Sequence, residues 1–80
     1  MATTDRTRLG KQFRKLRGDR TLAAVSEGSG IDKGVLSRVE HGEVIPSLRT
    51  LERLRRFHAV DDEVFLYWLS IIPDDREPAA

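Results

Sequence analysis

The chain has 80 residues, with 14 Lys and Arg against 13 Asp and Glu, which predicts one small domain whose formal net charge is only +1. The absence of cysteine excludes a disulfide framework and thiolate metal sites. No apolar run approaches the ~18 residues of a membrane-spanning helix, and residues 1–5 lead into no signal-peptide core, so we expect a cytoplasmic protein without a membrane partner.

The charge is unevenly distributed along the chain. Residues 1–60 hold 13 Lys and Arg and 7 Asp and Glu, a net +6, whereas residues 61–80 hold one Arg and 6 Asp and Glu, a net −5. Such asymmetry favours a basic surface for a polyanion, with the acidic end held away from it. The alternative is that these charges only lie on the solvent-exposed faces of a soluble helical domain. The charge distribution by itself does not decide between a polyanion-binding surface and ordinary solvated faces.

The first helix is predicted to begin at Thr4 or Asp5 and to end at Gly18. An apolar stripe spaced at i, i+4 and i+7 marks its buried face: Leu9, Phe13 and Leu16. We expect these side chains in the core.

A short helix is predicted next, over residues 22–27. Thr21 precedes it and carries a hydroxyl that can cap the helix N-terminus, and Val25 is its candidate core residue. Residues 28–30 are predicted to form a turn, because Gly30 tolerates a positive φ.

A second short helix is predicted over residues 33–41, between a capping Asp32 and a Gly42 that can adopt the left-handed conformation after the last turn. Its apolar stripe is Val35, Leu36 and Val39. Its other face shows donors and small residues without an acid: Lys33, Gly34, Ser37, Arg38 and His41. The major groove of DNA accepts a short helix with such a face.

Residues 43–46 are predicted to be a loop, since the residue before Pro46 is pushed out of the helical region. Ser47 can then cap a fourth helix. Its expected inward stripe is Leu48, Leu51, Leu54 and Phe57. Residues 58–60 are expected to be a short link.

Asp61 can cap a last helix, and the acidic residues after it suit the positive N-terminal end of the helix dipole. One side of this helix carries Val64, Phe65, Trp68, Leu69 and Ile72. Leu66, Tyr67 and Ile71 cover much of the rest, so the helix must be buried on more than one side. Residues 73–80 are polar and are expected to form a disordered acidic tail.

The stretch from residue 21 to 42 resembles the helix-turn-helix of the lambda-repressor or Cro/CI-type (Xre-like) DNA-binding domains. The positions that match without a gap are Thr21, Val25, Ser26, Gly30, Ile31, Leu36, Ser37, Val39, Glu40 and Gly42. Pro46 and Ser47 follow at the usual spacing. The resemblance implies an all-α fold, a compact five-helix bundle occupying residues 1–72.

It also implies that the helix over residues 33–41 enters the major groove of double-stranded DNA. The residues expected to contact bases are Lys33, Gly34, Ser37 and Arg38. Those expected to contact phosphates are Thr21, His41 and Arg49. Lys and Arg suit guanine, whose O6 and N7 are adjacent acceptors. The plainer alternative is that these side chains only solvate their helices.

Glu40 is an acid in the last turn of a helix expected to face DNA, so it needs a partner. In the family, the matching glutamate pairs with an arginine of the first helix, which is Arg17 or Arg14 here. We expect this ion pair to tie the two helices together. Leu22 stands where the family often has a glutamine that touches phosphate, so that contact is expected to be absent.

These features predict a sequence-specific transcriptional regulator, a repressor of bacterial or phage type, without enzymatic activity, metal or cofactor. His41 and His58 have no metal-like spacing, and no nucleophile has an evident base. The alternative is a protein-interaction module, such as an antitoxin or adaptor, that holds a protein partner with the last helix and the acidic tail.

One such domain reads one half-site, and two half-sites lie about 34–36 Å apart on one DNA face. We therefore expect a homodimer, stable by itself or formed only on DNA. The residues expected at its interface are Leu66, Tyr67, Trp68, Ile71 and Ile72. The alternative is that Phe65, Trp68 and Leu69 close the core against the first helix.

Overall fold

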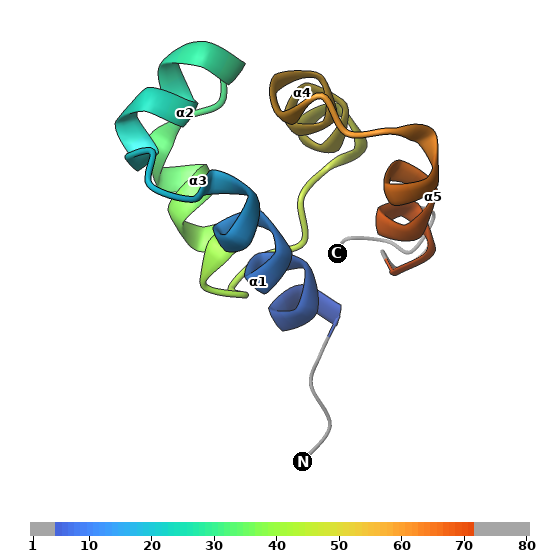
Figure 1. The fold of residues 1–80 in the computed structure, drawn as a ribbon. Coiled ribbons are helices and arrows are strands. Elements are labelled where there is room, and N and C mark those ends of the chain that lie inside the picture. Colours follow the sequence, from blue (N-terminus) through green and yellow to red (C-terminus); the bar gives the residue numbers. More distant parts are fainter. Residues whose placement is uncertain (1–4, 72–80) are drawn as a thin grey trace.

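The computed structural model describes residues 5–71, which form five α-helices and no strand (Figure 1). The helices are α1 (Asp5–Arg17), α2 (Leu22–Ser29), α3 (Lys33–Glu40), α4 (Leu48–His58) and α5 (Asp62–Ile71). This is the all-α, five-helix architecture that the sequence predicts. The expected tail over residues 73–80 lies outside the described residues.

Each helix from α2 to α5 begins at the predicted capping side chain. The side-chain oxygen accepts a hydrogen bond from a backbone N–H two or three residues further on, which satisfies a donor that the helix itself cannot pair. The four capping residues are Thr21, Asp32, Ser47 and Asp61.

The helix α2 is longer than predicted, because Gly28 and Ser29 continue it and only Gly30, at φ 75°, ends it. The glycine at position 28 has a packing role: a Cβ there would lie 2.4 Å from Cε1 of Phe57. The predicted turn over residues 28–30 is therefore wrong at its first two positions, since Gly28 makes room for α4 while remaining helical.

The end of α3 adopts the predicted glycine cap. Gly42 has φ 72°, its N–H donates to the carbonyl of Val39 at 3.1 Å, and the N–H of Glu43 donates to that of Arg38 at 2.9 Å. These two hydrogen bonds define a Schellman motif, which ends a helix and satisfies its last carbonyls. The helix ends at Glu40, one residue earlier than predicted.

Among the described residues, ten apolar side chains form the core, and Trp68 is the largest of those that are fully buried, with 0% of its surface exposed. The ring of Trp68 meets that of Phe13 edge to face, with 4.8 Å between centroids. Its indole N–H donates to Oε1 of Gln12 at 3.2 Å, so the buried polar atom is satisfied. The helix α5 thus closes the core against α1.

The predicted inward stripe of α4 is wrong at its first member, since Leu48 is 48% exposed while Leu51 and Leu54 are buried. Residues three apart on a helix are 300° apart, so a stripe with that spacing drifts by about 60° at each step. The helix also includes His58, which was expected in the link, and Ala59 directly after it adopts the left-handed conformation.

The helix α1 packs closely on the end of α3 because of Gly10. A Cβ at this position would lie 2.6 Å from the carbonyl oxygens of both Val39 and Glu40. Glycine allows the backbones of α1 and α3 to approach each other closely, so one side of α3 packs against α1. The opposite side of α3 remains on the surface.

Candidate nucleic-acid interface

The helix α3 has two distinct sides. At 100° per residue, the apolar Val35, Leu36 and Val39 occupy an arc from about 200° to 300°, counted from the start of the helix. Leu36 and Val39 are buried in the core. The expected contact residues occupy the remaining arc, within about 140° of the start, and they are Lys33, Gly34, Ser37, Arg38 and His41.

Lys33 and Arg38 are exposed, and neither side chain forms a hydrogen bond or ion pair with another described residue. The guanidinium of Arg38 lies beside Gly34, since a Cβ on Gly34 would be 3.6 Å from its Nη1. The missing side chain leaves the helix surface open next to this arginine. Ser37 is half-buried on the same arc.

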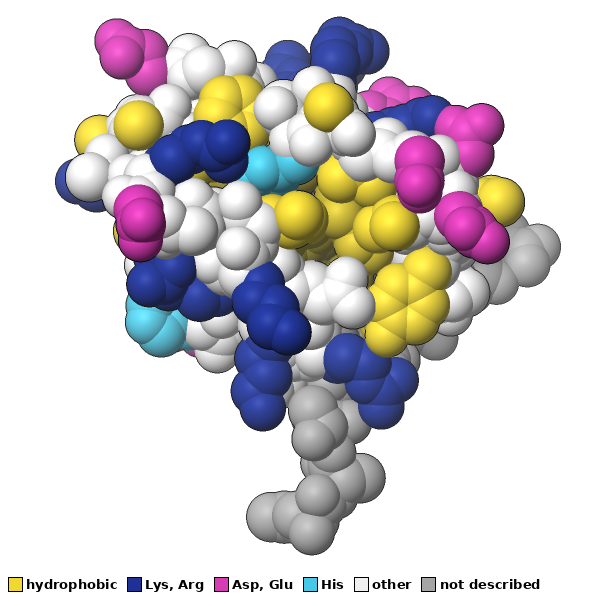
Figure 2. Space-filling view, in the orientation of Figure 1, with side chains coloured by type: hydrophobic (Ala, Val, Ile, Leu, Met, Phe, Trp, Pro, Cys, Tyr) yellow, Lys and Arg dark blue, Asp and Glu magenta, His cyan; other side chains and the backbone are white. Residues whose placement is uncertain are grey.

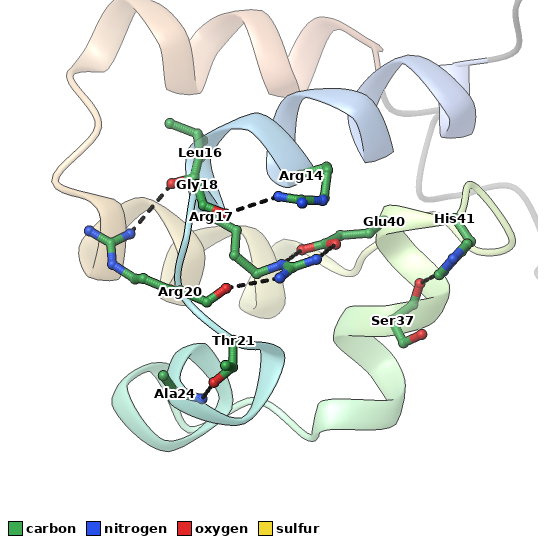
Figure 3. Close-up of polar contacts among 10 residues, drawn as sticks. All are labelled: Arg14, Leu16, Arg17, Gly18, Arg20, Thr21, Ala24, Ser37, Glu40 and His41. Atoms are coloured by element: carbon green, nitrogen blue, oxygen red, sulfur yellow. Dashed lines mark hydrogen bonds and ion pairs between the residues drawn. The ribbon is translucent and has the colours of Figure 1, made fainter.

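His41 directly follows the last residue of α3, and its Nδ1 is 2.7 Å from the carbonyl oxygen of Ser37 (Figure 3). Because a carbonyl oxygen only accepts, Nδ1 must carry the proton of this hydrogen bond. In the neutral ring Nε2 is then an acceptor. His41 can therefore donate to a phosphate through Nε2 only when the imidazole is protonated.

Thr21 caps α2 by accepting from the N–H of Ala24 at 3.0 Å (Figure 3). Its hydroxyl still has a hydrogen to donate. No acid stands in the first turn of α2, so the positive end of this helix is not neutralised by a side chain. The position is thus suited to a phosphate, as well as to its capping role.

The expected ion pair is present between Arg17 and Glu40. The arginine donates from Nε at 2.8 Å and from Nη2 at 2.9 Å to the two carboxylate oxygens (Figure 3). Only 16% of the Arg17 side chain and 8% of the Glu40 side chain are exposed. The hydrogen bond to Glu40 raises the pKa of Arg17, although burial opposes it. Arg14, the other candidate, donates instead to the carbonyl of Gly18.

Arg17 has a third contact that sequence reasoning missed. Its Nη1 donates to the carbonyl of Arg20 at 2.9 Å, immediately before the capping Thr21 (Figure 3). One guanidinium therefore holds the end of α3 and the entry to α2. A side-chain-to-backbone contact of this kind has no pattern in the sequence from which it could be found.

Three of the four arginines of α4 differ in their contacts. Arg53 donates to the carbonyl of Gly30 at 3.1 Å, and so ties α4 to the turn between α2 and α3. Arg55 forms an ion pair with Asp62, and its guanidinium lies 4.7 Å from the ring centroid of Phe65. Arg49 is exposed and has no such contact among the described residues. Arg49 is thus the one of these three that is available to a phosphate.

Two residues expected at a dimer interface lie in the core instead. Trp68 is 0% and Ile71 6% exposed, because these positions share the face of α5 that packs towards α1. Their assignment to an interface is therefore wrong. Leu66 and Tyr67 are exposed, by 63% and 41%. Ile72 lies outside the described residues.

Among residues 5–71, no group of three or more His, Cys, Asp or Glu side chains could hold a metal ion. Within the same range, none of the helices combines the length and the apolar character needed to cross a membrane.

Comparison with known proteins agrees with this geometry. The family model of the helix-turn-helix domain matches residues 8–66, a stretch that contains α2, α3 and α4 completely. The chain belongs to the helix-turn-helix domain family. No curated protein and no solved structure gives a significant match. The membership supports a DNA-binding helix-turn-helix domain over the matched residues.

Proposed function

We propose that this helix-turn-helix domain is a sequence-specific transcriptional regulator of the Cro/CI type, which acts as a repressor in the cytoplasm of a bacterium. The main support for this function is the division of α3 into a buried arc and an open arc. One arc is held in the core, whereas the other presents Lys33 and Arg38 without partners among the described residues. That open arc is the part of the helix that enters the major groove.

Base recognition in this proposal centres on Arg38. Its guanidinium can donate two hydrogen bonds to O6 and N7 of a guanine, an interaction worth about 1–3 kcal/mol of discrimination. Gly34 adds no side chain beside it, so the helix can lie deep in the groove. Lys33 and Ser37 supply further donors on the same arc.

Phosphate contacts fix the orientation without reading sequence. We assign them to Thr21 at the start of α2, His41 at the end of α3 and Arg49 in the first turn of α4. Glu40 does not repel the phosphates, because Arg17 neutralises its carboxylate. The logarithm of the association constant falls linearly with the logarithm of the salt concentration, and each phosphate that a cationic side chain neutralises steepens this slope by about 0.9.

Repression needs no chemistry under this proposal, since a protein on an operator excludes polymerase. Two copies on one DNA face would read two half-sites, so we also propose a homodimer that forms at least on DNA. Its interface must exclude Trp68 and Ile71, which are buried within the protomer.

Selection of duplexes from a random pool tests the function directly. We expect enrichment of a sequence with two related half-sites about 34–36 Å apart, and retention that weakens steeply with salt. A Lys33→Ala, Arg38→Ala variant serves as the control and should not enrich that sequence. No enrichment by the parent, together with no retention at low salt, would contradict the proposal and favour the protein-interaction alternative.

A further inference from the structure

A groove of about 560 Å³ lies between α1 and α5, on a different side of α1 from α3. It is lined by Arg8, Lys11, Gln12, Lys15, Leu16 and Val64. Figure 2 shows an apolar hollow on this face of the molecule, with basic side chains below it and acidic side chains to its right. Neither the core nor the proposed DNA contacts account for this surface.

The two sides of the groove carry opposite charges. On α1, Lys11 and Lys15 are exposed one turn apart. On α5, Asp62 and Glu63 form the acidic first turn, next to the groove residue Val64. The carboxylate of Asp62 contacts Arg55, yet 83% of its side chain is exposed and can meet a second cation.

A surface with one basic and one acidic side is complementary to a copy of itself. A two-fold rotation brings the basic side of each copy against the acidic side of the other, so the same charge contact forms twice. A partner of a single charge would match only one side of the groove. The charge pattern therefore favours a second copy of this chain as the occupant.

The groove also has apolar surface to cover. Val64 and Tyr67 are 37% and 41% exposed, and they are three residues apart, which places them next to each other on α5. Leu16 lines the groove from α1. Burying these side chains adds a hydrophobic contribution to the charge contacts.

We propose that two copies associate through this groove, with the acidic first turn of α5, Val64 and Tyr67 of one copy lying along Lys11 and Lys15 of the other. The inference rests on the proposed function, which requires two copies on one DNA face. Unlike Trp68 and Ile71, which are buried, Val64 and Tyr67 are accessible in the protomer and can meet a second copy.

The proposed contact leaves the DNA-binding arc open. Gly10 and Arg17, which hold α3, lie within about 20° of each other on α1, whereas Lys11 and Lys15 are about 100–140° away from Gly10. The same helix can thus support α3 with one side and contact the second copy with another.

A charge-swap experiment on the full chain tests this inference. One variant carries Lys11→Glu and Lys15→Glu, and the other carries Asp62→Lys and Glu63→Lys. In sedimentation equilibrium, each variant alone should lose at least about tenfold in association constant, because like charges then face each other. An equimolar mixture should regain the constant of the parent within about threefold, because opposite charges meet again at both contacts.

Two controls separate a local effect from a change of net charge. Lys33→Glu with Arg38→Glu reverses two positive charges on α3, and should abolish DNA binding while leaving association unchanged. Glu27→Lys with Glu43→Lys reverses two exposed acids away from the groove and should also associate like the parent. Circular dichroism and thermal melting verify that all variants fold, and a variant that does not is replaced by its single substitutions.

The outcomes for association and for DNA binding are distinguishable. The inference is overturned if the parent is monomeric up to about 1 mM and also binds a duplex with two half-sites without cooperativity. It is equally overturned if the mixture associates no better than either variant alone. If the groove variants bind a single half-site as tightly as the parent does, the proposed function stands whatever their association. If the parent itself does not bind a half-site, the proposed function is contradicted.

Discussion

Arg17 shows how one side chain can position a surface to which it does not belong. It is paired with Glu40 by two hydrogen bonds and also donates to the carbonyl of Arg20. Because both charged groups are largely removed from water, each depends on the other for the interactions that solvent would otherwise supply. The pair therefore matters for stability as well as for the orientation of α3.

Glu40→Gln should destabilise the fold by about 1–3 kcal/mol, since it leaves the covered Arg17 guanidinium without its charged acceptor. The matched control is Glu43→Gln, an exposed position whose change should stay within about 0.5 kcal/mol. Urea denaturation midpoints provide the measurement. Equal midpoints for the two variants would show that the pair adds nothing to stability.

His58 should make stability depend on pH. Burial, and to a lesser extent the charge of Arg20, lowers the pKa of His58 below 6.5, although Glu40 opposes the shift. The unfolded chain then binds a proton more readily than the folded one. Stability is accordingly complete above pH 6.5 and is lost as the pH falls from there towards the lower pKa of the folded state.

His58→Gln should remove this decline, whereas His41→Gln, at an exposed position, should keep it. Thermal unfolding between about pH 5 and 8 measures both, a range in which an unperturbed histidine changes its charge and most carboxylates do not. The same slope in the parent and in His58→Gln would assign the pH dependence to another group.

Arg38 and Arg49 should differ in how their loss changes DNA binding. Arg38→Ala should cost about 1–3 kcal/mol on the selected sequence and relax the preference at one base pair. Arg49→Ala should weaken all duplexes alike and reduce the salt slope by about 0.9. Competition binding with single-base variants of the duplex distinguishes the two patterns. Unchanged base preference in Arg38→Ala would remove this residue from the base contacts.

Two helical glycines, Gly10 and Gly34, differ in the atoms that surround them. At Gly10 the obstacles to a side chain are backbone carbonyls of α3, whereas at Gly34 the nearest atom is a carboxylate oxygen of Asp32, 3.0 Å from a Cβ. A carboxylate on an exposed side chain can shift by a few tenths of an ångström, but the end of a packed helix cannot do so alone.

Gly10→Ala should therefore destabilise the fold by about 1–3 kcal/mol, although alanine favours a helix by about 1 kcal/mol. Gly34→Ala meets no backbone atom and should not destabilise the fold, which makes it the control. Denaturant midpoints measure both variants. A Gly10→Ala protein as stable as Gly34→Ala would mean that the approach of α1 to α3 is not limited by this position.

Local signals predicted much of this fold because capping chemistry acts within a few residues. Thr21, Asp32 and Gly42 have the roles that their types and spacing indicate. The length of α2 could not be predicted, because the glycine at position 28 makes room for the ring of Phe57, which is far away in the sequence.

The burial of α5 was predicted only in part, for a similar reason. An apolar residue on nearly every side of a helix indicates burial but does not say which residues meet the core. The position of Trp68 is decided by Phe13 and Gln12 of α1, contacts between distant segments. At the candidate site, the ion pair of Arg17 and Glu40 followed from the family resemblance, whereas the roles of Arg53 and Arg55 depend on tertiary contacts.

The two proposed binding surfaces belong to different parts of the molecule. The open arc of α3 carries the proposed base contacts, and the groove between α1 and α5 carries the proposed contact with a second copy. A molecule divided in this way can bind DNA and associate at the same time, which is what reading two half-sites requires.

NMR titration of the labelled chain with a selected duplex carrying one half-site shows whether the open arc of α3 meets DNA. We expect the largest amide shift changes over residues 33–38 and at the start of α2, with Lys11, Lys15 and Val64 nearly unchanged. If the largest changes fall on the groove between α1 and α5 and α3 is unaffected, α3 is not the DNA-binding helix.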